Sequence, residues 1–424
     1  MSFETISVIG LGYIGLPTAA MFASRKIKVI GVDVNQHAVD TINQGKIHIV
    51  EPDLDMIVNA AVTEGYLKAT TKPEAADAFL IAVPTPFLPC SEGEIPAPDL
   101  SYIEAASKAI APVLKKGDLV ILESTSPVGT TEQMAAWLAE VRSDLTFPQT
   151  HGDNADVNIA HCPERVLPGH VVRELVENDR VIGGISPRCS DRSVELYKTF
   201  VQGECVITNA RTAEMAKLTE NSSRDVQIAF ANELSIICDK LGINVWELIA
   251  LANRHPRVNI LQPGPGVGGH CIAVDPWFIV SKTPEQAQII HTARKINDAK
   301  PDWVINKVKI AISDFLQKNP DKTAREVTIA CYGLAFKPDI DDLRESPAVE
   351  ITKKIADLHT GRVLAVEPNI KQIPIDFNGV ELKELDVANK ESDIHVILVD
   401  HKEFKSVKTV FSNCIYTVDC KGII

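Results

Sequence analysis

The sequence predicts an α/β protein in which two doubly wound parallel-sheet domains are joined by a long connector helix in an all-α central region. Three observations support this prediction. Short apolar runs alternate with helix-period segments from Ile6 to Glu123, the stretch Thr212–Leu241 has neither glycine nor proline, and the alternation returns at Val327. The expected domains are residues 1–210, 211–318 and 319–424.

Length and composition agree with this layout. The chain has 424 residues, and at roughly 100–200 residues per domain two or three domains are expected. The net charge of −13 argues against a nucleic-acid partner, because neutralising phosphates requires a basic surface. No apolar run reaches the roughly 18–20 residues of a membrane helix, and the N-terminus lacks a signal-peptide pattern. Nine scattered cysteines without a CxxC pair argue against a zinc site or a disulfide framework and favour the cytoplasm.

The strands of the first domain are read from runs rich in Val, Ile and Leu, which are typical of strands buried on both faces of a parallel sheet. Helical spacing in the segments between them indicates βαβ units. The predicted strands are Ile6–Gly10, Lys28–Asp33, Phe79–Val83, Leu119–Glu123, Val157–His161 and Val181–Gly184.

The central region is predicted to be helical. Thr212–Leu241 is rich in Ala, Glu, Leu and Lys, and Gly242 is placed to cap its C-terminal end. Asn244 followed by Glu247 is the pattern that begins a second helix, and Pro284–Leu316 forms a third. Strands of the last domain are expected at Val327–Tyr332, Val363–Val366 and Ile394–Val399.

A GxGxxG pattern, Gly10, Gly12 and Gly15, directly follows the first strand and opens a helix. Such glycines permit a tight turn and bring the backbone and the helix N-terminus close to a pyrophosphate. Asp33 ends the second strand, about 20 residues on, where a carboxylate binds both ribose hydroxyls. No arginine follows it for a 2′-phosphate, so NAD is favoured over NADP. A flavin, another adenosine ligand, or a glycine turn with an incidental aspartate are the alternatives.

Two loops follow predicted strands at the edge where a doubly wound sheet binds its ligand: Val83–Pro86 and Glu123–Thr131. Ordinary turns would have similar sequences. In the long helix, Lys217, Asn221 and Arg224 are spaced i, i+4 and i+7, which places a lysine, an amide and a guanidinium on one stripe. A solvated helix face is the simpler interpretation of that stripe.

The loop Gly264–Cys271 has four glycines before its cysteine, and Asp275 follows four residues after that cysteine. Glycines at this density indicate that the backbone closely approaches another group. A thiol of pKa about 8.5 needs a cation or hydrogen-bond donors to act as a nucleophile, and the stripe containing Lys217 could supply them. A buried, inert cysteine is the alternative.

With these motifs in view, the sequence resembles the UDP-glucose/GDP-mannose dehydrogenase family over almost its whole length. The resemblance rests on five motifs in the same order, each at a position already singled out. They are Gly10–Gly15, Cys162–Gly169, Glu214–Asn221, Gly266–Cys271, and Gly333–Asp339 together with Arg344–Pro347.

The resemblance implies a four-electron oxidation of the C6 alcohol of a UDP-sugar to a carboxylate, with two NAD and one water. Cys271 and Lys217 match catalytic residues of the family; the thiolate would form a thiohemiacetal and then a thioester. Asn221 would help Lys217 to stabilise the oxyanion. The candidates for handling protons and the hydrolytic water are Asp275 and Glu164, with Thr125 nearby.

The same residue-wise match implies two sets of binding residues. The cofactor set is Gly10, Gly12, Tyr13, Ile14, Gly15, Asp33, Thr85, Thr131 and Arg344. The substrate set is Arg165, Val166, Lys217, Asn221, Arg224, His255, Arg257, Gly268, Phe336, Lys337 and Lys421. Because Gly333 is the single glycine at the first strand of the last domain, that Rossmann-like domain is expected to bind UDP and no second dinucleotide.

Departures from the family pattern bear on the sugar. Ala273–Asp275 stands where many UDP-glucose dehydrogenases have Pro-Lys-Asp, and Glu164–Pro168 differs from their Glu-Phe-Leu segment. Both departures favour an N-acetylhexosamine, and overall similarity favours UDP-N-acetyl-D-mannosamine over UDP-N-acetylglucosamine or UDP-glucose. The resemblance also implies a homodimer and a role in cell-surface polysaccharide assembly, such as enterobacterial common antigen. A two-electron hydroxyacid dehydrogenase and a non-catalytic NAD-binding regulator are the rival functions.

Overall fold

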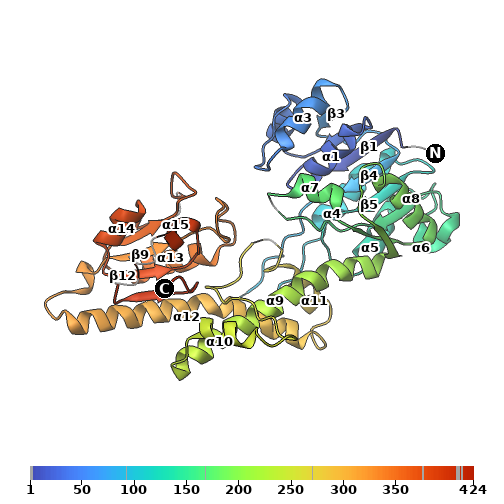
Figure 1. Cartoon of the computed structure of the whole chain (residues 1–424). Helices are drawn as coiled ribbons and strands as arrows, with labels where there is room; N and C mark the ends of the chain where they lie inside the picture. The colour runs from blue at the N-terminus through green and yellow to red at the C-terminus, as the bar shows by residue number, and fades with distance from the viewer. Residues whose placement is uncertain are drawn as a thin grey trace. The chain divides into compact units, whose positions relative to one another are not determined.

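The computed structural model describes residues 3–91, 93–167, 169–269, 271–374, 377–406, 411 and 414–424. Pro168 and His270, which belong to two of the motifs above, lie outside the described residues. The chain forms two compact units, residues 1–220 and 221–424 (Figure 1). No helix in the described part of the chain is both long and apolar enough to cross a membrane.

Within the described residues, the first unit has an eight-stranded sheet in the order β3-β2-β1-β4-β5-β6-β7-β8, parallel except for the β6–β7 pair. The antiparallel pair was not predicted. The strands are β1 Thr5–Ile9, β2 Lys28–Val32, β3 Leu67–Thr70, β4 Ala78–Ile81, β5 Leu119–Leu122, β6 Asn158–His161, β7 Arg180–Gly184 and β8 Cys205–Asn209. The helices are α1 Gly15–Ser24, α2 Gln36–Asn43, α3 Leu54–Thr63, α4 Ser101–Ile110, α5 Thr130–Val141, α6 Pro148–His151, α7 Val171–Glu177 and α8 Pro187–Tyr197.

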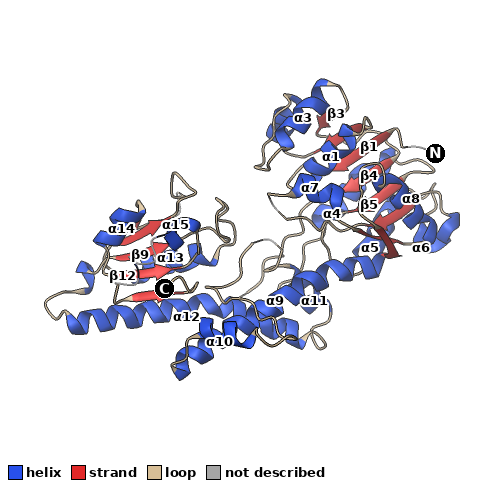
Figure 2. Ribbon diagram, viewed as in Figure 1, coloured by secondary structure: helices blue, strands red, loops and turns tan. Residues whose placement is uncertain are grey.

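Both faces of this sheet are buried under helices, as Figure 2 shows. In β4, Leu80 packs into the core that contains α1, whereas Phe79 and Ile81 pack into the core that contains α4 and α5. Alternate side chains therefore enter different hydrophobic cores, which explains the continuous apolar runs of the strands. The predicted doubly wound α/β fold is confirmed.

The connector helix α9 spans Ala210–Leu241. It ends as predicted, because Gly242 has a φ of 66° and the N–H of Ile243 donates to the carbonyl of Cys238 (2.9 Å). Helix α10, Val245–Ala252, begins after Asn244, whose side chain accepts hydrogen bonds from the N–H groups of Trp246 and Glu247. The division between the two units falls within α9, after its third turn.

Within the described residues, the second unit has a five-stranded parallel sheet in the order β11-β10-β9-β12-β13. Its strands are β9 Ile329–Tyr332, β10 Val363–Val366, β11 Val380–Leu382, β12 Ile394–Ile397 and β13 Thr417–Asp419. The further helices are α11 Asp275–Lys282, α12 Gln288–Lys318, α13 Pro347–Leu358, α14 Leu385–Glu391 and α15 Lys402–Ser406. The strand order matches that of β3-β2-β1-β4-β5, so both sheets are Rossmann-like.

Helix α12 serves both the helical region and the second sheet. It begins at Gln288 and not at the predicted Pro284, because the chain first closes a separate turn in which the N–H groups of Gln286 and Ala287 both donate to the carbonyl of Thr283. Its later part contributes Val304 and Val308 to the core under β9 and β10. The three-domain division at residues 210 and 318 stays a prediction.

The sequence did not predict four of the described strands, and all four are edge strands of the two sheets: β3, β8, β11 and β13. An edge strand is partly exposed and pairs on one side only, so its sequence need not be continuously apolar. β8, for example, has no buried residue.

Candidate active site

The glycine turn after β1 has the shape that a pyrophosphate requires. Gly10 has a φ of 90°, and an added Cβ would lie 2.5 Å from the Ala82 carbonyl oxygen. At Gly15 the Cβ would lie 1.8 Å from the Gly10 oxygen, whereas at Gly12 it would meet nothing within 4 Å. Gly10 and Gly15 are therefore required by the turn, and Gly12 leaves open space beside the N-terminus of α1.

Asp33 lies directly after β2 and faces this turn. Its Oδ2 accepts the N–H of Leu11 (2.8 Å) and its Oδ1 accepts the N–H of Asn35 (2.9 Å). Each carboxylate oxygen keeps a second lone pair, so the group can still accept both hydroxyls of a ribose. Tyr13 and Ile14, between the glycines and α1, are at the surface and partly exposed. These residues fit a bound dinucleotide.

Of the three predicted threonines, Thr85 follows β4, Thr125 follows β5, and Thr131 is the second residue of α5. The hydroxyl of Thr85 is buried without a hydrogen-bond partner among the described residues, and Thr125 is partly exposed. Thr131 is fully buried, and both its N–H and its hydroxyl donate to Glu214 of α9 (2.7 and 2.6 Å). The N–H of Gly129 donates to the other oxygen of Glu214 (2.6 Å). The start of α5 therefore anchors the first turns of α9, and the hydrogen-bonding groups of Thr131 are already engaged.

Glu164 is held in a buried ion pair. Arg180, at the start of β7, donates to Glu164 Oε2 (3.1 Å), and both side chains are almost fully buried. The guanidinium also lies over the ring of Tyr197, 5.0 Å from its centroid. Tyr197 in turn donates its hydroxyl to Glu123 at the end of β5 (2.6 Å). Burial raises the pKa of Glu123 to about 7, although the charge of Arg180 opposes this shift.

We expect Glu123→Gln to change how stability depends on pH. The pKa of Glu123 rises from 4.5 to about 7 on folding, so the stability that it contributes is present below pH 4.5 and lost as the pH rises through 7. Glutamine keeps the acceptor for Tyr197 but cannot ionise. Urea unfolding of the variant between pH 4.5 and 7 should show a smaller decrease in the free energy of unfolding; equal decreases would contradict the assignment.

The two neighbours of Glu164 in the substrate set are placed by the same loop. Arg165 forms a two-point pair with Glu220 of α9 (2.7 and 3.1 Å) and remains partly exposed. Val166 packs against the core of the first sheet. Arg165 is therefore available at the surface, whereas Val166 is largely a packing residue.

The glycine loop before Cys271 is tightly packed in the second unit. The N–H of Gly264 donates to the side chain of Asn232 on α9 (2.8 Å). A Cβ on Gly268 would lie 2.4 Å from the carbonyl oxygen of Glu345 and 2.7 Å from Pro347. The predicted close approach is thus to the segment before α13, and only glycine fits there.

Cys271 itself is exposed, and a carboxylate lies one turn after it. The carbonyl of Cys271 accepts the N–H of Asp275 (2.9 Å), which is the first residue of α11 and 3% exposed. Asn221 of α9 donates to Asp275 Oδ2 (2.5 Å). Lys217 lies four residues earlier on α9, in the part that belongs to the first unit. No disulfide joins any of the nine cysteines, all of which are described.

A cavity of about 320 Å³ lies beside the glycine loop and the end of β9. It brings together three residues of the predicted substrate set: Arg224, Phe336 and Lys421. Lys421 Nζ lies 3.2 Å from a carboxylate oxygen of Asp400. The backbone of Gly264–Gly266 forms part of the wall. Cations and backbone amides of this kind suit a diphosphate.

Four other predicted residues are not among those that line this cavity. Lys337 is exposed next to Phe336. His255 and Arg257 are exposed on the loop after α10. Arg344 forms a two-point pair with Asp342 (2.6 and 2.8 Å). Their assigned contacts stay predictions.

Sequence reasoning missed Arg180 and Asn232. Arg180 gave one signal, because a charged residue opening an apolar strand must be paired if that strand is buried. Asn232 gave none, since a single amide on a long helix is ordinary.

The known proteins that this chain resembles are nucleotide-sugar dehydrogenases. The NAD-binding, central and UDP-binding domain models of the UDP-glucose/GDP-mannose dehydrogenase family match residues 4–201, 211–299 and 330–424. A UDP-N-acetyl-D-mannosamine dehydrogenase of Yersinia pestis is 68% identical over 424 residues, all of both chains. An NDP-N-acetyl-D-galactosaminuronic acid dehydrogenase of Ralstonia solanacearum is 63% identical, covering 100% of this chain and 97% of that protein. The structure of a UDP-D-ManNAc dehydrogenase from Pyrococcus horikoshii has a TM-score of 0.85 at 39% identity, covering 99% of this chain and 96% of the other.

The NAD-binding domain model and these relatives define a dehydrogenase that uses an NAD-type cofactor and acts on nucleotide sugars. The chain belongs to the UDP-glucose/GDP-mannose dehydrogenase family.

Proposed function

We propose that the protein oxidises C6 of UDP-N-acetyl-D-mannosamine to give UDP-N-acetyl-D-mannosaminuronate, using two NAD and one water. This proposal depends most on the exposed thiol of Cys271, which lies one turn before the buried Asp275. The side chain of Asn221 donates a hydrogen bond to Asp275. A two-electron dehydrogenase would not need a nucleophilic sulfur. The dehydrogenases of Yersinia pestis and Pyrococcus horikoshii named above support the choice of sugar.

The turn residues Gly10–Gly15 and the carboxylate of Asp33 would hold NAD, which accepts a hydride when bound. The open space at Gly12 suits the pyrophosphate, and Asp33 suits an unphosphorylated ribose. A carboxylate at this position repels a 2′-phosphate, which supports NAD over NADP.

In the first half-reaction, the alcohol at C6 loses a proton and a hydride and becomes an aldehyde. The ammonium of Lys217 and the amide of Asn221 stabilise negative charge on the C6 oxygen. Because Asn221 donates to Asp275, the amide is already oriented before substrate binds. The buried Asp275 is a candidate acceptor for the proton.

In the second half-reaction, the thiolate of Cys271 adds to the aldehyde carbon and forms a thiohemiacetal. Loss of a second hydride converts it into a thioester, which water then cleaves to release the acid and the thiol. Glu164 is the candidate base for that water, with Thr125 as a further contact. Arg180 donates a hydrogen bond to Glu164, so the carboxylate has a defined position.

The expected stoichiometry tests this route directly. Each UDP-sugar consumed should yield two NADH, and no free aldehyde should accumulate, because the aldehyde carbon is captured by sulfur. Absorbance of NADH together with quantified sugar acid measures the ratio. One NADH per sugar would contradict the four-electron oxidation and restore the simple dehydrogenase; binding of NAD without any turnover would support the regulator.

Replacing Asp33 with alanine should weaken NAD binding by about 10–100-fold, since hydrogen bonds to a charged group contribute about 1.5–3 kcal/mol. It should also narrow the preference for NAD over NADP. Calorimetric titration of both cofactors measures this, with Asp40→Ala as a control, because Asp40 is an exposed carboxylate on α2. Equal use of both cofactors by the unmodified protein would contradict the assignment.

The sugar is tested by a panel of UDP-N-acetylmannosamine, UDP-N-acetylglucosamine, UDP-N-acetylgalactosamine and UDP-glucose. The Ralstonia relative justifies the galacto sugar in this panel. The highest kcat/KM is expected for UDP-N-acetylmannosamine. A preference of tenfold or more for another sugar would overturn the substrate while keeping the chemistry.

We further propose a homodimer formed along α9. This helix exposes Met215, Phe230, Ile237 and Leu241, large apolar side chains that a lone helix face would leave in water. The absence of disulfides among nine described cysteines supports action in the cytoplasm. The uronate product of the proposed reaction would be used to assemble a cell-surface polysaccharide such as enterobacterial common antigen.

A further inference from the structure

The turn after β9 in the second sheet repeats the backbone of the turn after β1. Gly10 donates its N–H to the carbonyl of Val32 (2.8 Å), and Gly333 donates its N–H to the carbonyl of Val366 (2.8 Å). Both glycines have a φ near 90°. The two sheets therefore end their first strands in the same way.

A carboxylate also recurs after the neighbouring strand, but its hydrogen bonds differ. In the first sheet, Asp33 accepts the N–H of Leu11 and remains partly exposed. In the second sheet, Glu367 is buried, and its Oε2 accepts the N–H groups of both Leu334 and Ala335 (2.7 and 3.0 Å). The carboxylate that would bind a ribose in a dinucleotide domain is here occupied by the loop after β9.

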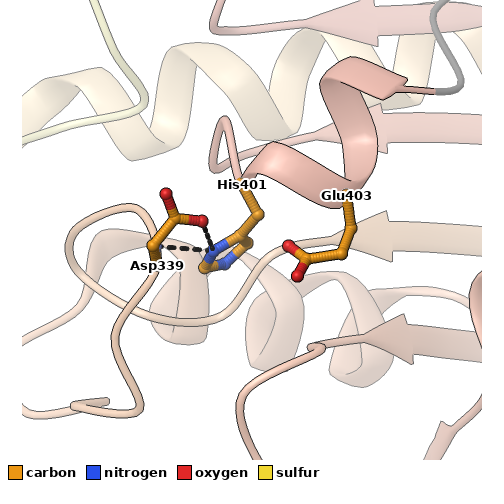
Figure 3. Close-up of side chains that lie close together, drawn as sticks. All are labelled: Asp339, His401 and Glu403. Carbon is orange, nitrogen blue, oxygen red and sulfur yellow. Dashed lines mark hydrogen bonds and ion pairs between the residues drawn. The ribbon is translucent and has the colours of Figure 1, made fainter.

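His401, in the loop after β12, completes this arrangement. Its Nε2 lies 3.0 Å from Glu367 Oε2, and its Nδ1 accepts the N–H of Asp339 (2.9 Å), as Figure 3 shows for the Asp339 contact. Burial alone would raise the pKa of Glu367, but the hydrogen bonds from His401 and the two amides lower it to about 2. Glu367 and His401 thus hold the loop at both ends, at Leu334 and at Asp339.

Asp339, His401 and Glu403 lie close enough together for a metal site (Figure 3). The hydrogen bonds argue against that interpretation. Nδ1 of His401 uses its lone pair for the Asp339 amide, and Nε2 uses its proton for Glu367. The imidazole therefore has no lone pair to offer a cation, and the cluster serves to position the loop.

The loop between Leu334 and Asp339 touches the glycine loop that precedes Cys271. A Cβ on Gly269 would lie 3.2 Å from the ring of Phe336, and one on Gly268 would lie 3.1 Å from the Cβ of Phe336. Ala335 and Phe336 also line the cavity that contains Lys421. The segment held by Glu367 is thus both a wall of the cavity and a support for the glycine backbone.

We propose that Glu367 and His401 are positioning residues for the UDP part of the substrate. They hold the loop so that Phe336 and its neighbour Lys337 meet the nucleotide, and they do so without touching it. This role rests on the proposed function only in that the ligand is a UDP-sugar; it does not depend on which sugar is oxidised or on the number of hydrides.

Glu367→Gln is the main test, measured by calorimetric titration of the full-length protein with UDP alone. Glutamine has nearly the same shape, but Glu367 Oε1 also accepts two hydrogen bonds from Asn369 (both 3.1 Å). An amide NH₂ would therefore face donors in either orientation. We expect the Kd for UDP to rise about tenfold or more, because the loop loses a hydrogen bond to a charged group and UDP binding must then restore the position of the loop. The KM for the UDP-sugar should rise similarly, with kcat and the KM for NAD changing less than threefold.

Glu381→Gln is the matched control. Glu381 is another carboxylate of this domain whose hydrogen bond from Arg362 helps to lower its pKa to about 2, but it lies exposed on the edge strand β11. Its replacement should leave the Kd for UDP unchanged. His401→Asn, which keeps an acceptor near the Nδ1 position and removes the donor to Glu367, is the second variant if Glu367→Gln does not fold.

The outcomes separate the alternatives. Normal UDP binding by folded Glu367→Gln and His401→Asn proteins would overturn the positioning role and leave a purely structural pair. Stoichiometric metal in the purified protein, with loss of UDP affinity after EDTA, would overturn it in favour of a metal site. If the unmodified protein does not bind UDP, the proposed function fails, and the positioning role fails with it.

Discussion

Replacing Cys271 with serine is expected to lower kcat for formation of the sugar acid by about 10³-fold or more, because a covalent nucleophile is removed. Serine cannot form the thioester from which the acid is released. Binding of NAD should be unchanged, since the glycine turn at Gly10–Gly15 belongs to the other unit of the chain. Steady-state kinetics and a calorimetric NAD titration measure the two effects.

Cys90→Ser is the matched control for this experiment, because Cys90 is also exposed but belongs to no predicted site. It should retain full activity. Wild-type turnover by the Cys271→Ser protein would show that the thiol has no chemical role and that its loop is glycine-rich only for the close approach of Gly268 to Glu345.

Replacing Arg180 with methionine is expected to lower the free energy of unfolding by about 3–5 kcal/mol, because it leaves a buried carboxylate without its cation. The carboxylates concerned are Glu164, which receives the guanidinium hydrogen bond, and Glu123, where burial raises the pKa and the charge of Arg180 opposes that rise. Melting temperatures should fall by roughly 10 °C. The kcat should also fall, since Glu164 loses the group that orients it.

Arg173→Met provides the comparison. Arg173 pairs with Glu177 on the surface of α7, with 76% of its side chain exposed, and water screens so exposed a pair that it adds little to stability. The stability of this variant should stay close to that of the unmodified protein. If both replacements lower the free energy of unfolding by the same small amount, the buried network around Glu164 does not stabilise the fold as proposed.

The elements that could be predicted from the sequence are those whose environment is uniform along the chain. Strands buried on both faces, such as β4 and β5, need apolar residues at every position, so a run of them is sufficient. Edge strands have no such requirement, and β8 and β13 were therefore missed. The antiparallel β6–β7 pair was missed because strand direction depends on the route of the connecting chain.

Part of the candidate site could be predicted from the sequence and part could not. Closely spaced glycines indicate a particular backbone conformation, so the turn at Gly10 and the loop before Cys271 could be identified from spacing alone. The hydrogen-bond or ion-pair partner of a polar side chain cannot be read from the sequence. The pairing of Arg180 with Glu164, 16 residues apart, and of His401 with Glu367, 34 residues apart, depended on which strand ends the fold brings together.

The sequence by itself determined the α/β class, the long helix α9 with its glycine cap, the glycine turn beside Asp33, and the glycine loop before Cys271, because each is encoded by residues close together in the chain. The tertiary structure alone decided which carboxylates are buried, which cation neutralises them, and that Glu367 is buried and holds a loop while Asp33 stays partly exposed. Those outcomes depend on contacts between distant segments, and a buried charge acquires its role only from the partner that the fold places beside it.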